Sequence, residues 1–383
     1  MVRLGDVCEI SSSKANLTDD KIWLLNLDMV EQQTGKIISY YYVNKNELNG
    51  SITQFDTENI LYSKLRPNLN KVVVPDRNGF STSELLPLKP NSKILCREYL
   101  ALYLRSDSFV SWAISKTAGA KMPRLGTKAL LDKEIPLPPL DEQRRIAATL
   151  DKVTDLISKR RQQLDKLDEL VKARFVEMFY NSVDSENWPS VIMADVCTNM
   201  RTGPFGSALH HDEFVEDGIF VLGIDNAVEN KFSYKRMRYI TEEKYEQLKR
   251  YTVHPGDVIV TIMGTVGRSA VIPEDIPKAI NTKHLACLTL DKSKALPAFI
   301  SSAIQMHPDI KRQMNGQAKG AIMDGLNLTI IKNLYFKLPP LEVQNKFSTF
   351  VEQTEKINST ISYGLEKLET LKKALMQEYF GVI

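Results

Sequence analysis

A short basic stretch in the first half of the chain has the side chains that proteins use to contact nucleic acid. Between Ser63 and Arg77 the sequence reads SKLRPNLNKVVVPDR, in which four cations stand against a single acidic residue. Lys and Arg neutralise phosphates, and Arg and Asn can each form two hydrogen bonds with a guanine or adenine edge. The candidate contact residues here are Lys64, Arg66, Asn68 and Lys71. A solvent-exposed hairpin face explains the same composition, so both interpretations stay open.

A second basic stretch, in the other half of the chain, interleaves cations with aromatic residues. From Lys231 to Arg250 the sequence reads KFSYKRMRYITEEKYEQLKR, and glutamates dilute its later part. Its first eight residues therefore favour contact with a polyanion more than the rest does. The candidates from this stretch are Lys235, Arg236 and Arg238.

Two loops with glycine residues add an arginine each. RTGPFGS runs from Arg201 to Ser207, and GTVGR runs from Gly264 to Arg268. Neither has the GK[ST] of a P-loop or the GxGxxG spacing of a dinucleotide fold, so glycines that serve turns are the simpler interpretation. Backbone that approaches a phosphate closely would also need glycine. On that second interpretation, Arg201 and Arg268 are candidate contacts.

Histidine and cysteine positions argue against metal and catalytic sites. All five histidines lie in the second half without an HExxH pattern, and the four cysteines lie far apart without a CxxC pair. We therefore expect buried reduced thiols, no metal site and no catalytic residue. In the sequence NTKH, at a strand boundary, Asn281, Lys283 and His284 are candidates to reach a base edge, although a plain surface loop is the alternative.

The composition is that of an ordinary globular protein. The chain has 383 residues, 43% of them hydrophobic and 25% charged, and a net charge of +3 that is too small to indicate nucleic acid by itself. No apolar run approaches the roughly 18 residues of a membrane span, and the first ten residues lack the layout of a signal peptide. We expect a cytoplasmic protein of two or three domains with no contact to a membrane.

Two long segments must position these candidates. Leu137 to Tyr180 and Leu338 to Phe380 both begin with LPPL, followed by an acidic residue and then by Gln143 or Gln344. Each continues for about forty residues without an internal proline, which predicts one long helix that starts after its proline pair. Gly381 is the expected end of the second helix, and Gly364 counts mildly against its continuity.

Apolar residues in these segments recur in alternating steps of four and three, which is the seam of a coiled coil. In the first segment the pairing residues are Ile146, Leu150, Val153, Ile157, Leu164, Leu167 and Val171, followed by Met178. In the second they are Phe347, Val351, Ile361, Leu365, Leu368 and Leu375, with the polar Thr354, Asn358 and Lys372 on the same seam. We expect the two helices to pack as an antiparallel coiled coil. Phe347, Thr354 and Asn358 stand where the first helix has aliphatic residues, so we expect them to thin the apolar seam of the second helix.

The rest of the chain repeats as well. Asn59 to Ser63 matches Asp257 to Thr261 at an offset of 198, Phe80 to Thr82 matches Ile280 to Thr282 at 200, and the LPPL segments match at 201. Because the offset never falls, both halves run through the same elements in the same order. The predicted fold is α+β, in which two mixed α/β globular domains are separated by two long helices with a pseudo-twofold internal repeat. The domains are 1–140 and 183–340, and the helical regions are 141–182 and 341–383.

This plan resembles the specificity subunit of type I restriction-modification systems. The resemblance covers essentially the whole chain and rests on ENILYSKLRPNLNKV and STSELLPLKP in the first domain, RTGPFGSAL and GDVIVTIMGTVGR in the second, and IPLPPLDEQRRIAATLD at the first junction. Val343, in place of the glutamate before Gln344, departs from the family pattern and leaves the equivalence of the two helices in docking a partner open.

The resemblance implies that each globular domain is a target recognition domain that reads one half of a bipartite site in double-stranded DNA. It also implies that the helix pair sets the spacer and docks two methyltransferase subunits, and that up to two restriction subunits join the complex. Those partners would carry the S-adenosylmethionine, ATP and Mg²⁺ chemistry, so this chain needs no cofactor. A protein-binding adaptor with a coiled-coil spacer is one alternative, and a nuclease with an unfamiliar active site is another.

Overall fold

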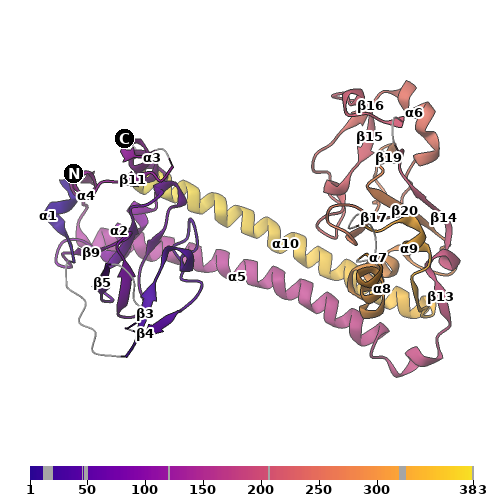
Figure 1. Cartoon of the computed structure of the whole chain (residues 1–383), viewed down its shortest axis with the longest axis horizontal. Coiled ribbons are helices and arrows are strands. Elements are labelled where there is room, and N and C mark those ends of the chain that lie inside the picture. The colour runs from indigo at the N-terminus through magenta and orange to yellow at the C-terminus, as the bar shows by residue number, and fades with distance from the viewer. Residues whose placement is uncertain are drawn as a thin grey trace. The chain divides into compact units, whose positions relative to one another are not determined.

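The computed structural model describes residues 1–11, 20–44, 46, 51–119, 121–205, 208–318 and 325–381. It divides into two compact units (Figure 1). Unit 1 comprises Met1–Arg161 and Tyr363–Ile383, and unit 2 comprises Gln162–Ser362. Each unit thus contains one globular part and a portion of each long helix.

Unit 1 has two four-stranded sheets. The first has the order β2-β9-β6-β7 with every pair antiparallel, and the second has the order β4-β3-β8-β5 with a parallel pair β3-β8. Their bounds are β2 Cys8–Ile10, β3 Lys21–Leu25, β4 Tyr42–Asn44, β5 Ile52–Phe55, β6 Ile60–Ser63, β7 Val72–Val73, β8 Gly79–Thr82 and β9 Leu85–Pro90. Two short pairs complete the set, β1 Val2–Arg3 with β12 Glu134–Ile135 and β10 Thr117–Ala118 with β11 Arg124–Leu125.

Short helices cover the first sheet of unit 1. They are α1 Leu4–Val7, α2 Arg97–Leu104, α3 Asp107–Ser115 and α4 Thr127–Leu131. The hydroxyl of Ser106 accepts a hydrogen bond from the Phe109 backbone N–H, which starts α3 by capping it. Buried residues from α2, α3, β6 and β9 form one core, and Ile146, Ala147 and Leu150 of the first long helix join it.

Unit 2 repeats this arrangement. Its four-stranded antiparallel sheet has the order β14-β20-β17-β18, and its second sheet has the order β16-β15-β19 with a parallel pair β15-β19. The bounds are β13 Ser190–Ile192, β14 Cys197–Thr202, β15 Ile219–Leu222, β16 Tyr239–Ile240, β17 Val258–Thr261, β18 Ser269–Val271, β19 Ala279–Asn281, β20 Leu285–Leu290 and β21 Tyr335–Lys337. The helices are α6 Glu242–Leu248, α7 Pro297–Met306, α8 Pro308–Ala318 and α9 Leu328–Lys332.

The strand orders confirm the internal repeat that the sequence predicts. β2, β9, β6 and β7 correspond to β14, β20, β17 and β18, and β4, β3 and β8 correspond to β16, β15 and β19. The pair β1-β12 corresponds to β13-β21 in the same way. Equivalent strands of the two units are therefore followed by equivalent loops, so the loops of unit 1 and unit 2 can be compared directly.

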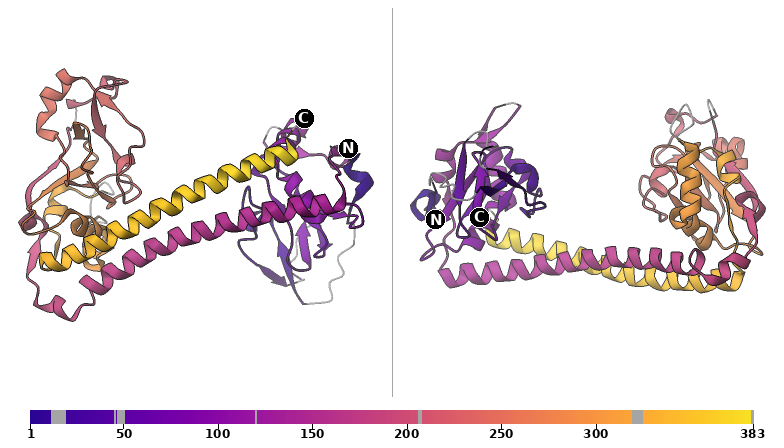
Figure 2. Two further views of the ribbon diagram at one scale, coloured as in Figure 1. Left: turned by 180° about the vertical axis from the view of Figure 1, so that it is seen from behind. Right: turned by 60° about the horizontal axis from the view of Figure 1, so that its bottom comes forward.

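The two long helices are α5 Leu140–Phe179 and α10 Leu341–Phe380, each of 40 residues. Figure 2 shows α5 in magenta beside α10 in yellow, with their directions opposed. Within unit 1, Arg161 Nη2 lies 2.7 Å from Glu369 Oε1, and within unit 2, Phe175 packs on Phe347. The antiparallel packing of the helices is thus confirmed. Gly364 lies inside the uninterrupted α10, which ends directly before Gly381.

Burial along the helices follows the predicted seam with one shift. Ile146, Leu150, Val153 and Ile157 are buried, and the later seam residues of α5 are half-buried. In the last turns of α5, Phe175 and Phe179 are buried. The seam therefore moves there by one position, from the predicted Met178 to Phe179, because aromatic rings fill the core of unit 2.

Phe347 corrects a second expectation. We expected it to thin the seam of the second copy, but it is fully buried, with ring centroids 5.4 Å from Phe175 and 5.2 Å from Phe179. A buried aromatic side chain contributes more apolar area than the aliphatic residue of a regular seam. Phe347 thus lies on the seam as predicted, but the expectation that it thins the seam is wrong, because its ring packs against two aromatic rings of α5.

Gln143 and Gln344 explain why both helices begin alike. Both side chains are fully buried. Gln143 Oε1 accepts from the Cys96 backbone N–H at 2.8 Å, and its Nε2 donates to the carbonyls of Ile94 and Pro138 at 2.9 and 2.8 Å. Gln344 makes the same three bonds with Leu296, Lys294 and Pro339, at 2.8, 3.0 and 2.8 Å. Each glutamine thereby fixes the first turn of a long helix to the start of α2 or α7.

Candidate nucleic-acid interface

Three segments of unit 2 meet at one end of its sheets. They follow β15, β17 and β19, and they are Gly223–Asn226, Ile262–Arg268 and Thr282–His284. The Ile262 N–H donates to the His284 carbonyl at 2.9 Å, and the Thr282 N–H donates to the Leu222 carbonyl at 2.9 Å. A Cβ on Gly264 would lie 3.4 Å from Ile224 Cδ1. Loops at strand ends that are held in this way can present a fixed set of side chains.

Arg238 is the best-anchored cation of this end. Its Nη2 lies 2.8 Å from Asp225 Oδ2, and its guanidinium lies over Gly223, where a Cβ would come within 2.6 Å of Nη1. Burial lowers the pKa of His284, and the nearby charges of Lys283 and Arg238 lower it further. Three of the predicted residues, Arg238, Lys283 and His284, therefore lie close enough to one another to interact electrostatically.

Three further cations of unit 2 stand at the surface. Lys235 Nζ lies 2.6 Å from Glu229 Oε1, and Arg236 Nη1 lies 3.7 Å from Asp225 Oδ1. The backbone N–H of Arg268 donates to Thr261 Oγ1 at 2.9 Å, and the Arg268 side chain is exposed. Surface ion pairs of this kind are weak and exchange readily for a phosphate.

Two other predicted residues have their side chains inside unit 2. The Arg201 side chain is 11% exposed; its Nη2 lies 3.0 Å from Asp257 Oδ2 and also donates to the Thr252 carbonyl, while its Nη1 donates to Thr289 Oγ1 at 3.0 Å. Asn281 is fully buried, and its amide donates to the Leu285 carbonyl at 2.9 Å. The same loop region contains Gly203, where a Cβ would lie 2.1 Å from the Asn281 carbonyl oxygen. A glycine is required there because backbone packs directly on backbone. Gly206 and Ser207 lie outside the described residues.

In unit 1 the predicted residues lie at the equivalent strand ends. Arg66 and Asn68 follow β6 and are exposed, and Arg66 has a left-handed backbone with φ of 49°. The Arg66 N–H donates to the Pro123 carbonyl at 2.8 Å, and the Asn68 carbonyl accepts from Gln33 Nε2 at 3.1 Å. The loop is thus held by contacts from two other segments, and the Arg66 and Asn68 side chains lie at the surface.

The two predicted lysines of unit 1, Lys64 and Lys71, are less exposed than Arg66. Lys64 is half-buried, and its backbone bridges Glu84 and Leu125 through hydrogen bonds of 3.1 and 2.9 Å. The Lys71 ammonium donates to the Leu27 carbonyl, and burial lowers its pKa. Lys71 would have to leave this carbonyl to reach a phosphate.

Sequence reasoning did not single out Asp225 or Tyr41. Asp225 orients Arg238, and its equivalent in unit 1 is Asp28, which stands at the same distance from the preceding strand. Tyr41 is the residue of unit 1 that is equivalent to Arg238, because the carbonyls of both accept a hydrogen bond from equivalent strand residues, Leu24 and Val221. The signal available was the offset of 197 between Asp28 and Asp225, which continues the offsets of the repeat.

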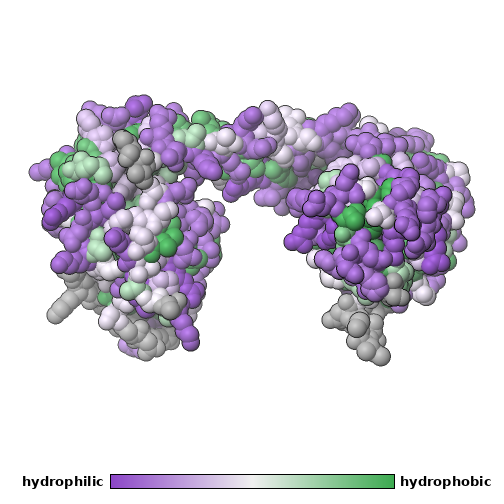
Figure 3. All heavy atoms as spheres, turned by 90° about the horizontal axis from the view of Figure 1, so that it is seen from above, coloured by the Kyte–Doolittle hydropathy of each residue, from purple (hydrophilic) through white to green (hydrophobic). Residues whose placement is uncertain are grey.

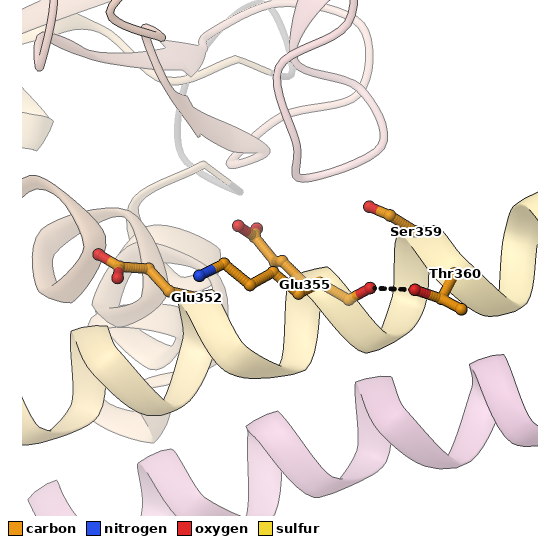
Figure 4. A pocket seen from close by; sticks show the side chains of 5 residues that line it. Glu352, Glu355, Ser359 and Thr360 are labelled. Carbon is orange, nitrogen blue, oxygen red and sulfur yellow. Dashed lines mark hydrogen bonds between the residues drawn. The ribbon is translucent and has the colours of Figure 1, made fainter.

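Two hollows lie away from these loops. Figure 3 shows hydrophilic residues over most of the visible face, with hydrophobic residues in small separate patches. A hollow of 580 Å³ in unit 2 is lined by residues of α10 alone, and the Thr360 hydroxyl there only donates to the Lys356 carbonyl of its own helix (Figure 4). A second hollow, of 420 Å³ in unit 1, is lined among others by Glu98, Arg105 and Asp151.

Metal and membrane features were searched in the described ranges. No group of three or more His, Cys, Asp or Glu side chains among them is placed to hold a metal ion. None of the helices there is long and apolar enough to cross a membrane. All four cysteines are free; Cys8 and Cys287 are buried, whereas Cys96 and Cys197 are half-buried.

The fold and the loop sites define a class of protein with two equivalent α/β units and an antiparallel helix pair. Residues 1–168 and 187–370 each match the family model of the type I restriction modification DNA specificity domain. Because these matches cover most of the chain, the protein belongs to this family.

Curated relatives carry the corresponding names. The chain is 23% identical over 306 residues to the type I restriction enzyme EcoBI specificity subunit of Escherichia coli, which covers 73% of this chain and 64% of the relative. It is 22% identical over 318 residues to the MjaVIII specificity subunit of Methanocaldococcus jannaschii, which covers 78% of this chain and 73% of the relative. The chain thus spans somewhat less than two thirds of the EcoBI subunit.

Solved structures have the same fold. A chain from work on complex assembly and conformational transition of the type I R-M system matches with a TM-score of 0.62 at 17% identity, covering 99% of this chain and 96% of that one. The type I restriction-modification S subunit from M. genitalium matches with a TM-score of 0.62 at 14% identity, covering 100% and 96%. At these identities the likeness concerns the fold alone.

Proposed function

We propose that this chain is the DNA sequence-specificity subunit of a type I restriction-modification complex. Each globular domain reads one half of a bipartite site in double-stranded DNA, and the helix pair sets the length of the spacer between the halves. The chain itself carries no catalytic step, and it acts in the cytoplasm. The proposed division is into target recognition domains at 1–140 and 183–340 and helical regions at 141–182 and 341–383.

The observation that carries this proposal is the duplication of one loop site. The loop between β6 and β7 in unit 1 carries the exposed side chains Arg66 and Asn68, and the equivalent loop between β17 and β18 in unit 2 carries the exposed Arg268. Lys283, which follows β19, adds a further exposed cation in unit 2. A duplex offers phosphates and base edges that repeat along its axis, so two similar binding units suit two sites on one ligand. The family match supports the same conclusion.

Helix length supports the role as a spacer. A helix of 40 residues is about 60 Å long at roughly 1.5 Å per residue. One turn of B-DNA is about 34 Å, so a helix pair of this length suits half-sites one to two turns apart.

Partners follow from the same assignment. We propose that the helical regions dock two methyltransferase subunits and that up to two restriction subunits join them. S-adenosylmethionine, ATP and Mg²⁺ would then be bound by those partners, and the chemistry of methyl transfer and cleavage would be theirs.

Salt dependence of DNA binding tests the proposal against a protein-binding adaptor. The purified full chain is titrated with a duplex library at several salt concentrations. Phosphate contacts release counterions, so the logarithm of the association constant should fall steeply with the logarithm of salt concentration. A slope near zero, or no binding at low salt, would contradict the proposal and favour the adaptor. Cleavage of the duplex by the chain with Mg²⁺ alone would favour the nuclease.

A further inference from the structure

Arg238 and Tyr41 occupy the same position in the two units. In unit 2 the Val221 N–H donates to the Arg238 carbonyl at 2.8 Å, and in unit 1 the Leu24 N–H donates to the Tyr41 carbonyl at 3.2 Å. Val221 and Leu24 are equivalent because each lies in the strand that pairs in parallel with β19 or β8. The repeat therefore places an arginine and a tyrosine at one equivalent point.

Unit 2 builds a donor site around this point. Asp225 holds the Arg238 guanidinium at 2.8 Å, and the missing side chain of Gly223 leaves room for it. Lys283 adds positive charge nearby. Burial lowers the pKa of His284, and the charges of Lys283 and Arg238 lower it further, so the neutral imidazole is favoured. The Arg238 side chain remains 33% exposed. An arginine that is oriented by a carboxylate and still reaches the surface is suited to donate two hydrogen bonds to guanine O6 and N7.

Unit 1 offers different chemistry at the same point. Tyr41 is 55% exposed and provides a ring and a hydroxyl in place of a guanidinium. Glu84 and Ser83 stand at the positions of His284 and Lys283, and Arg124 holds the Glu84 carboxylate at 3.0 Å. The cations Arg238 and Lys283 of unit 2 are thus replaced in unit 1 by Tyr41 and Ser83, which carry no fixed charge. The charge of Glu84, in place of His284, is paired with Arg124.

We propose that Arg238 is a specificity-determining residue that reads a guanine in the half-site of unit 2, and that Tyr41 gives unit 1 a different base preference at the equivalent step. This inference rests on the proposed function. It assigns Asp225 and Gly223 a positioning role, because they orient the guanidinium without contacting DNA themselves.

Selection from a random duplex library, read by sequencing, tests the assignment. The full chain is compared with Arg238→Ala, Arg238→Lys and Asp225→Asn, each checked by thermal unfolding. Arg238→Ala should lower discrimination at one guanine by about 10-fold or more. Arg238→Lys keeps the charge but loses the paired donors, so discrimination should fall while affinity is largely kept. Asp225→Asn should give a smaller loss at the same base.

Two variants on the same surfaces serve as controls. Lys235→Ala, at an exposed cation three residues away that pairs with Glu229 and not with Asp225, should weaken binding to all sequences alike. Tyr41→Ala should change only the other half-site. Unchanged base preference in folded Arg238→Ala and Arg238→Lys would overturn the inference while the proposed function stands. If the unaltered chain enriches no bipartite sequence, the proposed function itself fails.

Discussion

At the scale of single residues, the contacts that hold the fold and the contacts offered to DNA are separable. Gln143 and Gln344 are buried and make three hydrogen bonds each, whereas Arg268 and Arg66 are exposed at strand ends. A buried polar group that loses its partner costs much more than an exposed one. Substitutions at the first kind of residue should therefore change stability, and substitutions at the second kind should change binding.

Gln143→Leu should destabilise unit 1. The substitution leaves the Cys96 N–H and the Ile94 and Pro138 carbonyls without their partner, which should cost about 2–5 kcal/mol of unfolding free energy. Denaturant unfolding measures the change, and Gln344→Leu should have a similar effect in unit 2. Arg144→Gln, at the exposed neighbour of Gln143, is the control and should stay within about 0.5 kcal/mol. An equally small effect of Gln143→Leu would show that the buried amide does not fix the helix start.

Arg201 and Arg268 should behave in opposite ways. Arg201→Met leaves the Asp257 carboxylate buried without its cation, which should destabilise unit 2 by about 3–5 kcal/mol. Arg268→Ala should keep the melting temperature and reduce DNA affinity, with a shallower dependence on salt. Thermal unfolding and a binding titration on both variants check this. An Arg201→Met chain of normal stability with weakened DNA binding would instead support the sequence-based prediction that Arg201 contacts DNA.

His307 should make stability depend on pH. Burial lowers its pKa, with a smaller opposite effect of Asp309, and its Nδ1 accepts from the Asp309 N–H at 3.2 Å. The unfolded chain then binds the proton more readily than the folded one, so stability is full above the unfolded pKa of about 6.5 and falls as pH is lowered through the folded pKa. His307→Asn can keep the acceptor without titrating, so unfolding measured from pH 7.5 to 5 should show a flatter profile. An identical slope in both proteins would contradict this.

At the scale of elements, aromatic residues join the long helices to the core of the globular part of unit 2. Phe175 and Phe179 of α5 contact Phe347 of α10 and Phe299 of α7. Each helix is therefore part of the core of a globular unit as well as part of a coiled coil.

Phe175→Ala should accordingly cost about 3–5 kcal/mol, because it removes a fully buried ring. Leu170→Ala on the same helix is the matched control, since Leu170 is 49% exposed and its truncation should cost little. Differential scanning calorimetry on both variants separates the two cases. Equal melting temperatures would mean that the aromatic cluster contributes nothing to unit 2.

The elements also show which features the sequence could predict. LPPL, the heptads and the offsets of the repeat predicted both long helices, their antiparallel packing and the duplicated α/β units, because these are periodic or repeated patterns. The burial of Phe175 and Phe179 and the aromatic contacts of Phe347 were missed, since they depend on what the globular unit packs against the helix. Of the candidate contact residues, the sequence placed exposed ones such as Arg66 and Arg268 in loops. It could not show that Arg201 pairs with Asp257 or that Asp225 orients Arg238, because these contacts join residues distant in the sequence.

At the scale of the whole molecule, we propose that the helix pair sets the distance between the two half-sites on DNA. Removing seven residues from α5, 158–164, and seven from the facing part of α10, 366–372, keeps the heptad phase and shortens each helix by about 10 Å. The recognised spacer should then become shorter, by at most about three base pairs, because B-DNA rises roughly 3.4 Å per pair. Both half-sequences should stay unchanged, since neither globular part is altered.

The most direct test is long-read detection of methylated adenines in a strain that carries this chain and its methyltransferase, compared with a strain that carries the shortened chain. The account predicts one bipartite motif in the first strain, and in the second the same two half-sequences with a shorter spacer. Methylation at an unchanged spacer in the shortened chain would contradict the claim that the helix pair sets the distance between the two half-sites.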